Sequence, residues 1–171
     1  MTKLFSPIII DICIIMMRIY ELVKSNVKKG DLKKIDWLIT DICTIINSSN
    51  IYKELADNNF IEWKEEHYNK KRIDNLSTED FDMYTISWMS GQMSPIHDHP
   101  QYGCIMFLIS GTLEEKLYNK KLELVKTTII KGPYIGYIDN KIGFHSIKCI
   151  DKAVSLHIYS PGKYKPFLMS A

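Results

Sequence analysis

The second half of this 171-residue chain consists of short segments in which apolar residues alternate with others. Alternation with a period of two is typical of strands, because successive side chains of a strand point to opposite faces. Turn signals such as Gly132-Pro133 and Asp139-Asn140 separate the segments. Many short antiparallel strands predict a sandwich or a barrel. The predicted strands cover 84–88, 103–109, 112–118, 122–130, 134–138, 144–150 and 153–160.

The first half of the chain has a different texture, because its apolar residues recur at helical spacing. One apolar stripe runs from Ile8 to Val27 and a second from Leu32 to Ile45, so we predict two long helices there. Shorter helices are expected from Tyr52 onward and over 61–68. The simplest interpretation is that these helices pack on the strands, which makes the fold mainly β with N-terminal helices.

No linker or low-complexity segment separates the two halves, so the sequence predicts one domain over residues 1–171. A helical layer over 1–75 would cover a β-barrel over 80–165. A chain of this length is long enough to bury a core of its own.

Charge and cysteine usage exclude several classes of protein. The formal net charge is +2 and no basic stripe is interleaved with aromatic residues, so no nucleic-acid partner is expected. The apolar segment 7–17 is interrupted by Asp11 and is too short to span a bilayer, so no membrane partner is expected. Four scattered cysteines without a Cys-x-x-Cys pair argue against a disulfide framework and indicate a reducing compartment. We therefore expect a cytoplasmic monomer.

His97 and His99 are the first candidates for chemistry, in the segment Ser94-Pro95-Ile96-His97-Asp98-His99-Pro100. One residue separates them on an extended segment, so their side chains point to the same side. Two neutral imidazoles that converge make half of a transition-metal site. The same pattern would also arise from two ordinary histidines at the end of a strand.

Ser155, His157 and Tyr159 recur with a period of two, so they share one face of a strand. A histidine and a tyrosine inside a barrel need partners for their polar atoms, and the Ser155 hydroxyl could hold His157 in one tautomer. Three barrel-lining residues with satisfied hydrogen bonds are the alternative interpretation.

The spacing from Gly91 through the two histidines to Cys104 and Gly111 resembles the first motif of the cupin superfamily. Five residues separate Gly91 from His97, four separate His99 from Cys104, and six separate Cys104 from Gly111. Most cupins have a glutamate ligand where this chain has Cys104. Their second motif usually supplies one more histidine, and the candidate here is His145 in Ile142-Gly143-Phe144-His145.

The cysteine in place of glutamate, together with the block Ser155-Leu156-His157-Ile158-Tyr159-Ser160-Pro161, narrows the resemblance. From Trp88 to Pro161 the chain resembles the thiol dioxygenases of the cysteine dioxygenase type. The resemblance implies a cupin barrel, also called a double-stranded β-helix or jelly roll. It also implies an oxidoreductase of cysteine metabolism that adds both atoms of O2 to the thiol of L-cysteine and gives cysteine sulfinic acid.

The same resemblance assigns roles to individual residues. His97, His99 and His145 would be the ligands of a non-haem Fe(II). Ser155, His157 and Tyr159 would form a hydrogen-bonded relay beside the ion. Cys104 and Tyr159 would be joined by a thioether bond, as a protein-derived cofactor. Three neutral ligands leave the ion its full double charge, which favours a thiolate from the substrate.

In this family an arginine upstream of the barrel motif, commonly in a Tyr-x-Arg pattern, holds the substrate carboxylate. Here the residues are Lys70-Lys71-Arg72. Arg72 is the candidate, because a guanidinium group binds a carboxylate through two parallel hydrogen bonds. Lys71 is the alternative after a one-residue shift, and an exposed basic end of a helix is a third interpretation. A lysine at this position would weigh against L-cysteine relative to another carboxylated thiol such as 3-mercaptopropionate.

Two further functions are compatible with a cupin barrel, since the fold hosts many chemistries. One is an enzyme that oxygenates or isomerises a different small acid. The other is a non-catalytic ligand-binding module. The pairing of Cys104 with Tyr159 argues against the first, and the absence of an evident DNA-reading helix argues against a sensing role.

Overall fold

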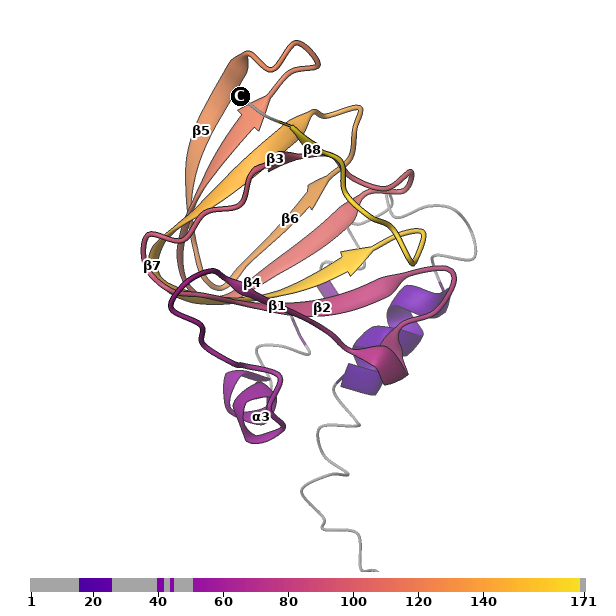
Figure 1. Ribbon diagram of the computed structural model, residues 1–171. Coiled ribbons are helices and arrows are strands. Elements are labelled where there is room, and N and C mark those ends of the chain that lie inside the picture. Colours follow the sequence, from indigo (N-terminus) through magenta and orange to yellow (C-terminus); the bar gives the residue numbers. More distant parts are fainter. Residues whose placement is uncertain (1–15, 26–39, 42–43, 45–50, 170–171) are drawn as a thin grey trace, which may run out of the picture.

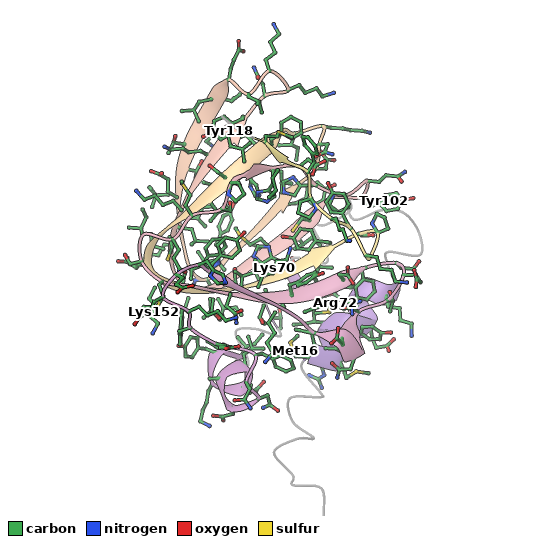
Figure 2. The ribbon with its side chains drawn as sticks, viewed as in Figure 1. Met16, Lys70, Arg72, Tyr102, Tyr118 and Lys152 are labelled. Carbon is green, nitrogen blue, oxygen red and sulfur yellow. The ribbon has the colours of Figure 1, made fainter. Side chains whose placement is uncertain are left out.

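The computed structural model describes residues 16–25, 40–41, 44 and 51–169. Eight strands form one strongly curled sheet, and the described helices lie outside the curl (Figure 1). Figure 2 shows side chains from the strands filling the space inside the curl. Within the described part of the chain, no helix is both long and apolar enough to cross a membrane.

The helices and strands come in the following order along the chain. A helix over 16–25 and α3 (Ile51–Asp57) precede β1 (Asn69–Arg72), the 3-10 helix η1 (Asp74–Leu76), β2 (Asp82–Trp88), β3 (Ile96–His97), β4 (Cys104–Tyr118), β5 (Leu124–Lys131), β6 (Tyr134–Ile138), β7 (Phe144–Tyr159) and β8 (Leu168–Met169). The strands pair in the order β1-β2-β7-β3-β8, and β4 pairs with β5, β6 and β7. The predicted mainly β fold with N-terminal helices is confirmed for the described residues, whereas the helix predicted over 32–45 lies largely outside them.

Strands β4 and β7 are each longer than the sequence predicts, because Gly111 and Asp151-Lys152 do not end a strand. The ladder between β4 and β7 shifts register around Ser110 and Thr112 instead of breaking. Gly111 has a φ of +90°, and a Cβ on it would lie 2.4 Å from the Lys152 carbonyl oxygen. A glycine in the left-handed region is typical of a β-bulge, so this turn signal marks a bulge inside a continuous strand.

The helix predicted over 61–68 is wrong, as is the interpretation of Lys70-Lys71-Arg72 as the end of a helix. Residues 61–68 have no helical structure, and the basic run belongs to β1. β1 pairs antiparallel with β2, with Lys70 opposite Ile86 and Arg72 opposite Tyr84. Pairing with the next strand, β2, therefore overrides the local sequence preference here.

The two faces of the sheet have different partners. The outer face packs against the helices in a cluster that includes Met16, Ile19, Val23, Leu55, Phe81, Met83, Leu156 and Ile158. The inner face holds a second cluster that includes Ile86, Trp88, Met106, Leu113 and Ile147. Because side chains alternate along a strand, β7 buries Leu156 and Ile158 outside the curl and presents Ser155, His157 and Tyr159 inside it.

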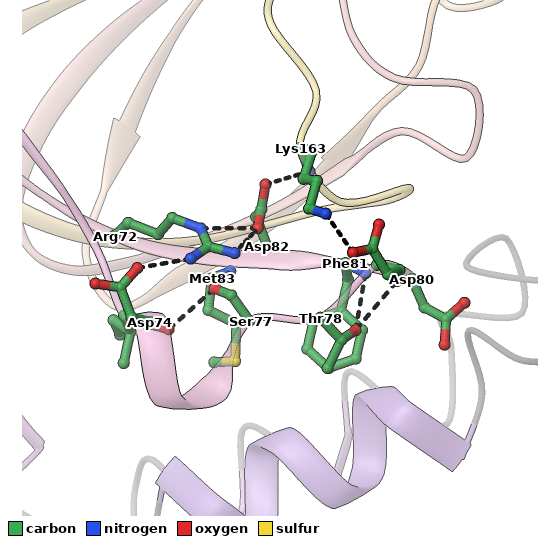
Figure 3. Close-up of polar contacts among 11 residues, drawn as sticks. Arg72, Asp74, Ser77, Thr78, Asp80, Phe81, Asp82, Met83 and Lys163 are labelled. Carbon is green, nitrogen blue, oxygen red and sulfur yellow. Dashed lines mark hydrogen bonds and ion pairs between the residues drawn. The ribbon is translucent and has the colours of Figure 1, made fainter.

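An ion-pair network at the end of β1 and the start of β2 joins these strands to the segment after β7 (Figure 3). The Asp82 side chain is 1% exposed and accepts hydrogen bonds from Arg72 Nε at 2.9 Å and Nη2 at 2.7 Å. It also accepts one from the Lys163 backbone N–H at 2.6 Å. Asp74 accepts from Arg72 Nη1 at 2.6 Å. Arg72 thus neutralises a buried carboxylate.

Arg72→Ala should lower the free energy of unfolding by about 2 kcal/mol, because it leaves the buried Asp82 carboxylate without two charge-assisted hydrogen bonds. Urea denaturation measures the change. Lys53→Ala is the control, since it removes an ion pair between exposed side chains. Equal stability of the two variants would contradict a structural role for Arg72.

Candidate metal centre

Pairing between β3 and β7 brings the three predicted histidines together. His97 on β3 lies directly opposite His145 on β7, and their Nε2 atoms are 3.2 Å apart. His99 follows two residues after His97, and its Nε2 atom is 3.1 Å from that of His145. One nitrogen from each of the three rings lies within 4.8 Å of the other two. Three imidazoles from separate parts of the chain therefore face one point.

The outer nitrogens of two of these rings have acceptors that fix the tautomer. His97 Nδ1 is 2.9 Å from the Pro95 carbonyl oxygen, and His145 Nδ1 is 2.7 Å from Glu115 Oε1. Because a carbonyl or a carboxylate only accepts, each Nδ1 carries the proton and each Nε2 presents a lone pair to the common point. The Nδ1 atom of His99 is buried without a hydrogen-bond partner among the described residues.

Burial favours the neutral form of the His97 and His99 rings. It lowers the pKa of His97 to about 3 and lowers that of His99 further, and charge on His145 acts in the same direction on both. Metal binding requires neutral imidazole, so no proton has to be displaced from either ring near neutral pH. Three converging imidazole nitrogens fit a divalent transition metal ion that accepts nitrogen ligands.

The cluster opens into a cavity of about 90 Å³ inside the curl. A water molecule needs roughly 10–15 Å³ of such volume, so this cavity holds a ligand of only a few non-hydrogen atoms. Its wall combines apolar and polar groups, as ligand sites commonly do. The lining includes Tyr68, Lys70, Trp88, His97, Cys104, Met106, Glu115, Tyr134, His145, His157, Tyr159 and Leu168.

Ser155, His157 and Tyr159 form a hydrogen-bonded row along the cavity side of β7. Trp88 Nε1 donates to Ser155 Oγ at 3.1 Å, and Ser155 Oγ lies 2.9 Å from His157 Nε2. Ser155 Oγ thus accepts one hydrogen bond from Trp88 and keeps its own proton and a second lone pair for the contact with His157 Nε2. His157 Nδ1 lies 3.5 Å from the Tyr159 hydroxyl. The row therefore connects Trp88, Ser155 and His157 to the phenolic oxygen of Tyr159.

Cys104 lies directly opposite Tyr159 in the ladder between β4 and β7, and both side chains are buried. The Cys104 sulfur is 3.8 Å from His157 Nδ1. Burial raises the pKa of Cys104 to about 12 and that of Tyr159 well above its ordinary value, so both groups are protonated near neutral pH. The two residues of the predicted thioether are thus neighbours, and the bond itself stays a prediction.

The prediction that Arg72 binds a substrate carboxylate does not agree with its position. Arg72 is not among the residues that line the cavity, because its guanidinium group is paired with Asp82 and Asp74 outside it. Lys71, the alternative, bonds to the Asn59 carbonyl oxygen and does not line the cavity either. Lys70 is the basic residue of β1 that lines it (Figure 2).

The Nζ atom of Lys70 is held by aromatic faces, 4.2 Å from the centre of the Tyr159 ring and 4.3 Å from that of Tyr84. No carboxylate of the described residues lies within ion-pair distance of it. Burial lowers the pKa of Lys70. Its charge also lowers the pKa of His97, His99 and His157, so it lies close enough to affect the cluster.

Lys70 and Glu115 were not identified as site residues from the sequence, although the sequence around each contains a pattern that could have indicated it. Tyr68-Asn69-Lys70 matches the family's Tyr-x-Arg pattern once lysine replaces the arginine. Tyr68 stacks on Trp88 in the cavity wall, with ring centroids 4.4 Å apart. Glu115 stands between Leu113 and Leu117 at a period of two, so the apolar face of a strand carries a charged residue there.

Comparison with solved structures defines the class of protein. The fold is similar to that of an uncharacterised protein with a double-stranded β-helix domain from Klebsiella pneumoniae, with a TM-score of 0.55 and 18% identity over 67% of this chain and 94% of that one. It is also similar to a point mutant of Bacillus subtilis oxalate decarboxylase, with a TM-score of 0.51 and 15% identity over 62% of this chain and 29% of that one. The chain thus has a double-stranded β-helix fold, and this fold carries a cluster of three histidines.

Sequence comparison identifies the family. The family model "Cysteine dioxygenase type I" matches residues 38–166, so the chain belongs to that family, and the resemblance seen in the sequence is confirmed. Human cysteine dioxygenase type 1 is 34% identical over 90 residues, which cover 47% of this chain and 45% of the human protein. The zebrafish (Danio rerio) protein of that name is 28% identical over 112 residues, which cover 60% of this chain and 55% of the zebrafish protein. The chain therefore spans about half the length of the curated relatives it matches.

A thioether between Cys104 and Tyr159 should reduce the intact mass by two hydrogens, because one hydrogen leaves the sulfur and one leaves the ring. Mass spectrometry of the iron-loaded protein after exposure to thiol and O2 measures this loss, and tryptic mapping should join the two segments. Cys149→Ser is the control and should show the same loss, since Cys149 does not line the cavity. An unchanged mass would exclude the bond.

Proposed function

We propose that this protein is an Fe(II)-dependent thiol dioxygenase that converts L-cysteine to cysteine sulfinic acid. The observation that carries the proposal is the convergence of three imidazoles at a small cavity that is lined by His97, His145 and the ammonium group of Lys70. Membership of the cysteine dioxygenase type I family supports the same reaction. The reaction RSH + O2 → RSO2H is balanced as written, because sulfur loses the four electrons that dioxygen gains.

His97, His99 and His145 would hold the iron through their Nε2 atoms. When bound, Fe(II) supplies the redox chemistry that lets dioxygen react with a thiolate. The three ligands contribute no negative charge, so the site favours a substrate that binds as an anion. Binding near a divalent cation lowers the pKa of a substrate thiol, which gives thiolate near neutral pH.

The hydrogen-bonded row on β7 would position the Tyr159 hydroxyl. In the His157 tautomer with the proton on Nδ1, the ring would donate to the phenolic oxygen, and the phenol would donate its own proton into the cavity. A buried phenol with a raised pKa stays protonated and can hold an oxygen atom of the reacting groups by a hydrogen bond. Cys104, beside the ring, would fix its orientation, and more firmly if the thioether forms.

Lys70 would bind the carboxylate of the substrate. Among the described residues, the close partners of its ammonium group are the ring faces of Tyr84 and Tyr159, and a carboxylate is a stronger partner for a half-buried cation. A lysine ammonium group is a point charge, whereas a guanidinium group makes two parallel hydrogen bonds to a carboxylate. Lys70 would therefore fix the orientation of the substrate carboxylate less strictly than an arginine would. This favours 3-mercaptopropionate as the second candidate substrate, since it shares the carboxylate and thiol of cysteine and lacks the amine.

Anaerobically iron-loaded protein should consume O2 and form sulfinate when cysteine is added. His145→Ala should lose both iron and turnover, because it removes one of three ligands. Tyr159→Phe is the matched variant: it should retain iron and turn over more slowly. Oxygen uptake, sulfinate detection and iron content measure these results. No turnover with cysteine, 3-mercaptopropionate or cysteamine would overturn the proposal.

Lys70→Met should raise the KM for cysteine and for 3-mercaptopropionate about 10–100-fold, which corresponds to the loss of one charged hydrogen bond. The KM for cysteamine should change little, because cysteamine has no carboxylate. Lys71→Met is the control, since its side chain lies outside the cavity. An equal rise in KM for all three thiols would contradict carboxylate binding by Lys70.

The pH dependence of KM is a second test of carboxylate binding by Lys70. A depressed pKa means that Lys70 loses its proton below the ordinary lysine value of 10.5. The KM for carboxylated thiols should therefore rise at alkaline pH in the wild type, while Lys70→Arg should shift that rise to higher pH.

A further inference from the structure

Glu115 lies behind His145 in the fold. On β4 it is two residues from Leu117, which is directly opposite His145, so Glu115 and His145 are diagonal neighbours on the inner face of the ladder. The Glu115 Oε1 atom is 2.7 Å from His145 Nδ1, and Glu115 also lines the cavity. Its chain neighbour Glu114 does not line the cavity and lies 3.8 Å from the ammonium group of Lys116.

The three imidazoles differ in what their outer nitrogens contact. His97 faces a backbone carbonyl, His99 has no partner among the described residues, and His145 faces a carboxylate. Only His145 thus has an anion behind it. Burial is the main cause of the raised pKa of Tyr134, and the charge of the Glu115 carboxylate is the second cause. The charge of Glu115 therefore acts on another part of the cavity wall.

A carboxylate that accepts from a ligating histidine raises the basicity of the opposite nitrogen and fixes the ring orientation. Iron centres of the common two-histidine type have a carboxylate as a direct ligand, which offsets half the charge of the ion. In this chain the cluster of potential ligands contains three histidines and no carboxylate among the described residues. Glu115 is not a direct ligand in this cluster. Its negative charge lies behind His145, so the imidazole ring separates the carboxylate from the point where the metal ion would bind.

We propose that Glu115 is a positioning residue that supplies the fixed negative charge of the metal centre through His145. This inference rests on the proposed iron site and adds a residue that determines its affinity and potential. The carboxylate strengthens His145 Nε2 as a donor. It also stabilises Fe(III) relative to Fe(II), because the more highly charged ion gains more from a nearby anion.

Glu115→Gln tests the charge separately from the geometry, since an amide oxygen still accepts from His145 Nδ1–H. Fe(II) affinity is measured anaerobically by competition with a chelator, and the Fe(III)/Fe(II) midpoint potential by titration. Glu115→Gln should bind Fe(II) about 10–100-fold more weakly and show a higher potential than the wild type. Glu114→Gln, the same change at the neighbouring residue, should match the wild type in both measurements.

Equal affinity and potential for Glu115→Gln and Glu114→Gln would overturn the inference. If Glu115→Gln does not fold, Glu115→Asp and Glu114→Asp are compared instead. Glu115→Asp withdraws the carboxylate by one methylene group and should bind Fe(II) more weakly than Glu114→Asp, and equal affinities would overturn the inference. A wild-type protein that binds no Fe(II) would count against the proposed function itself, so the two failures are distinguishable.

Discussion

The site depends on the register between β3 and β7. β3 has only two residues, but it pairs on one side with β7 and on the other with β8. Asp98 adds to this support, because its carboxylate accepts from the Phe167 backbone N–H at 2.7 Å and from the Tyr164 hydroxyl. A slip of one residue would turn His97 away from His145, since side chains alternate between faces. The segment around β8 therefore fixes the position of a histidine, although it contributes no ligand.

Alternation along β7 connects the site to the hydrophobic core. Leu156 and Ile158 are fully buried against the outer cluster, and the residues between and beside them face the cavity. The packing that stabilises the sheet thus also fixes His157 and Tyr159, because one strand carries both sets. The same burial lowers the pKa of His157 and raises that of Tyr159, which leaves a row of uncharged hydrogen-bonding groups beside the histidine cluster.

The sequence predicts the residues of the site well where local pattern determines them. The structure brings His97, His145, His157 and Tyr159 to one cavity, and it places His99 and Ser155 within hydrogen-bond distance of these residues. Lys70, the proposed carboxylate-binding residue, was not predictable in this way, because β1 depends on pairing with β2. Lys70 and Arg72 then share a face of a strand, and it is Asp82, ten residues beyond Arg72, that draws the guanidinium group out of the cavity.

The charges of the cavity determine what it can bind. Lys70 is a cation in the wall, the histidine cluster would add a divalent ion, and Glu115 is the only acidic side chain among the described residues that line the cavity. Glu115 is already engaged with His145, so it offsets part of the charge of the ion and none of the charge of Lys70. A ligand with two anionic groups, a thiolate for the ion and a carboxylate for the ammonium group, balances what remains. A thiol without a carboxylate would leave Lys70 with only aromatic faces as partners, which is the electrostatic reason to expect a small thiol acid.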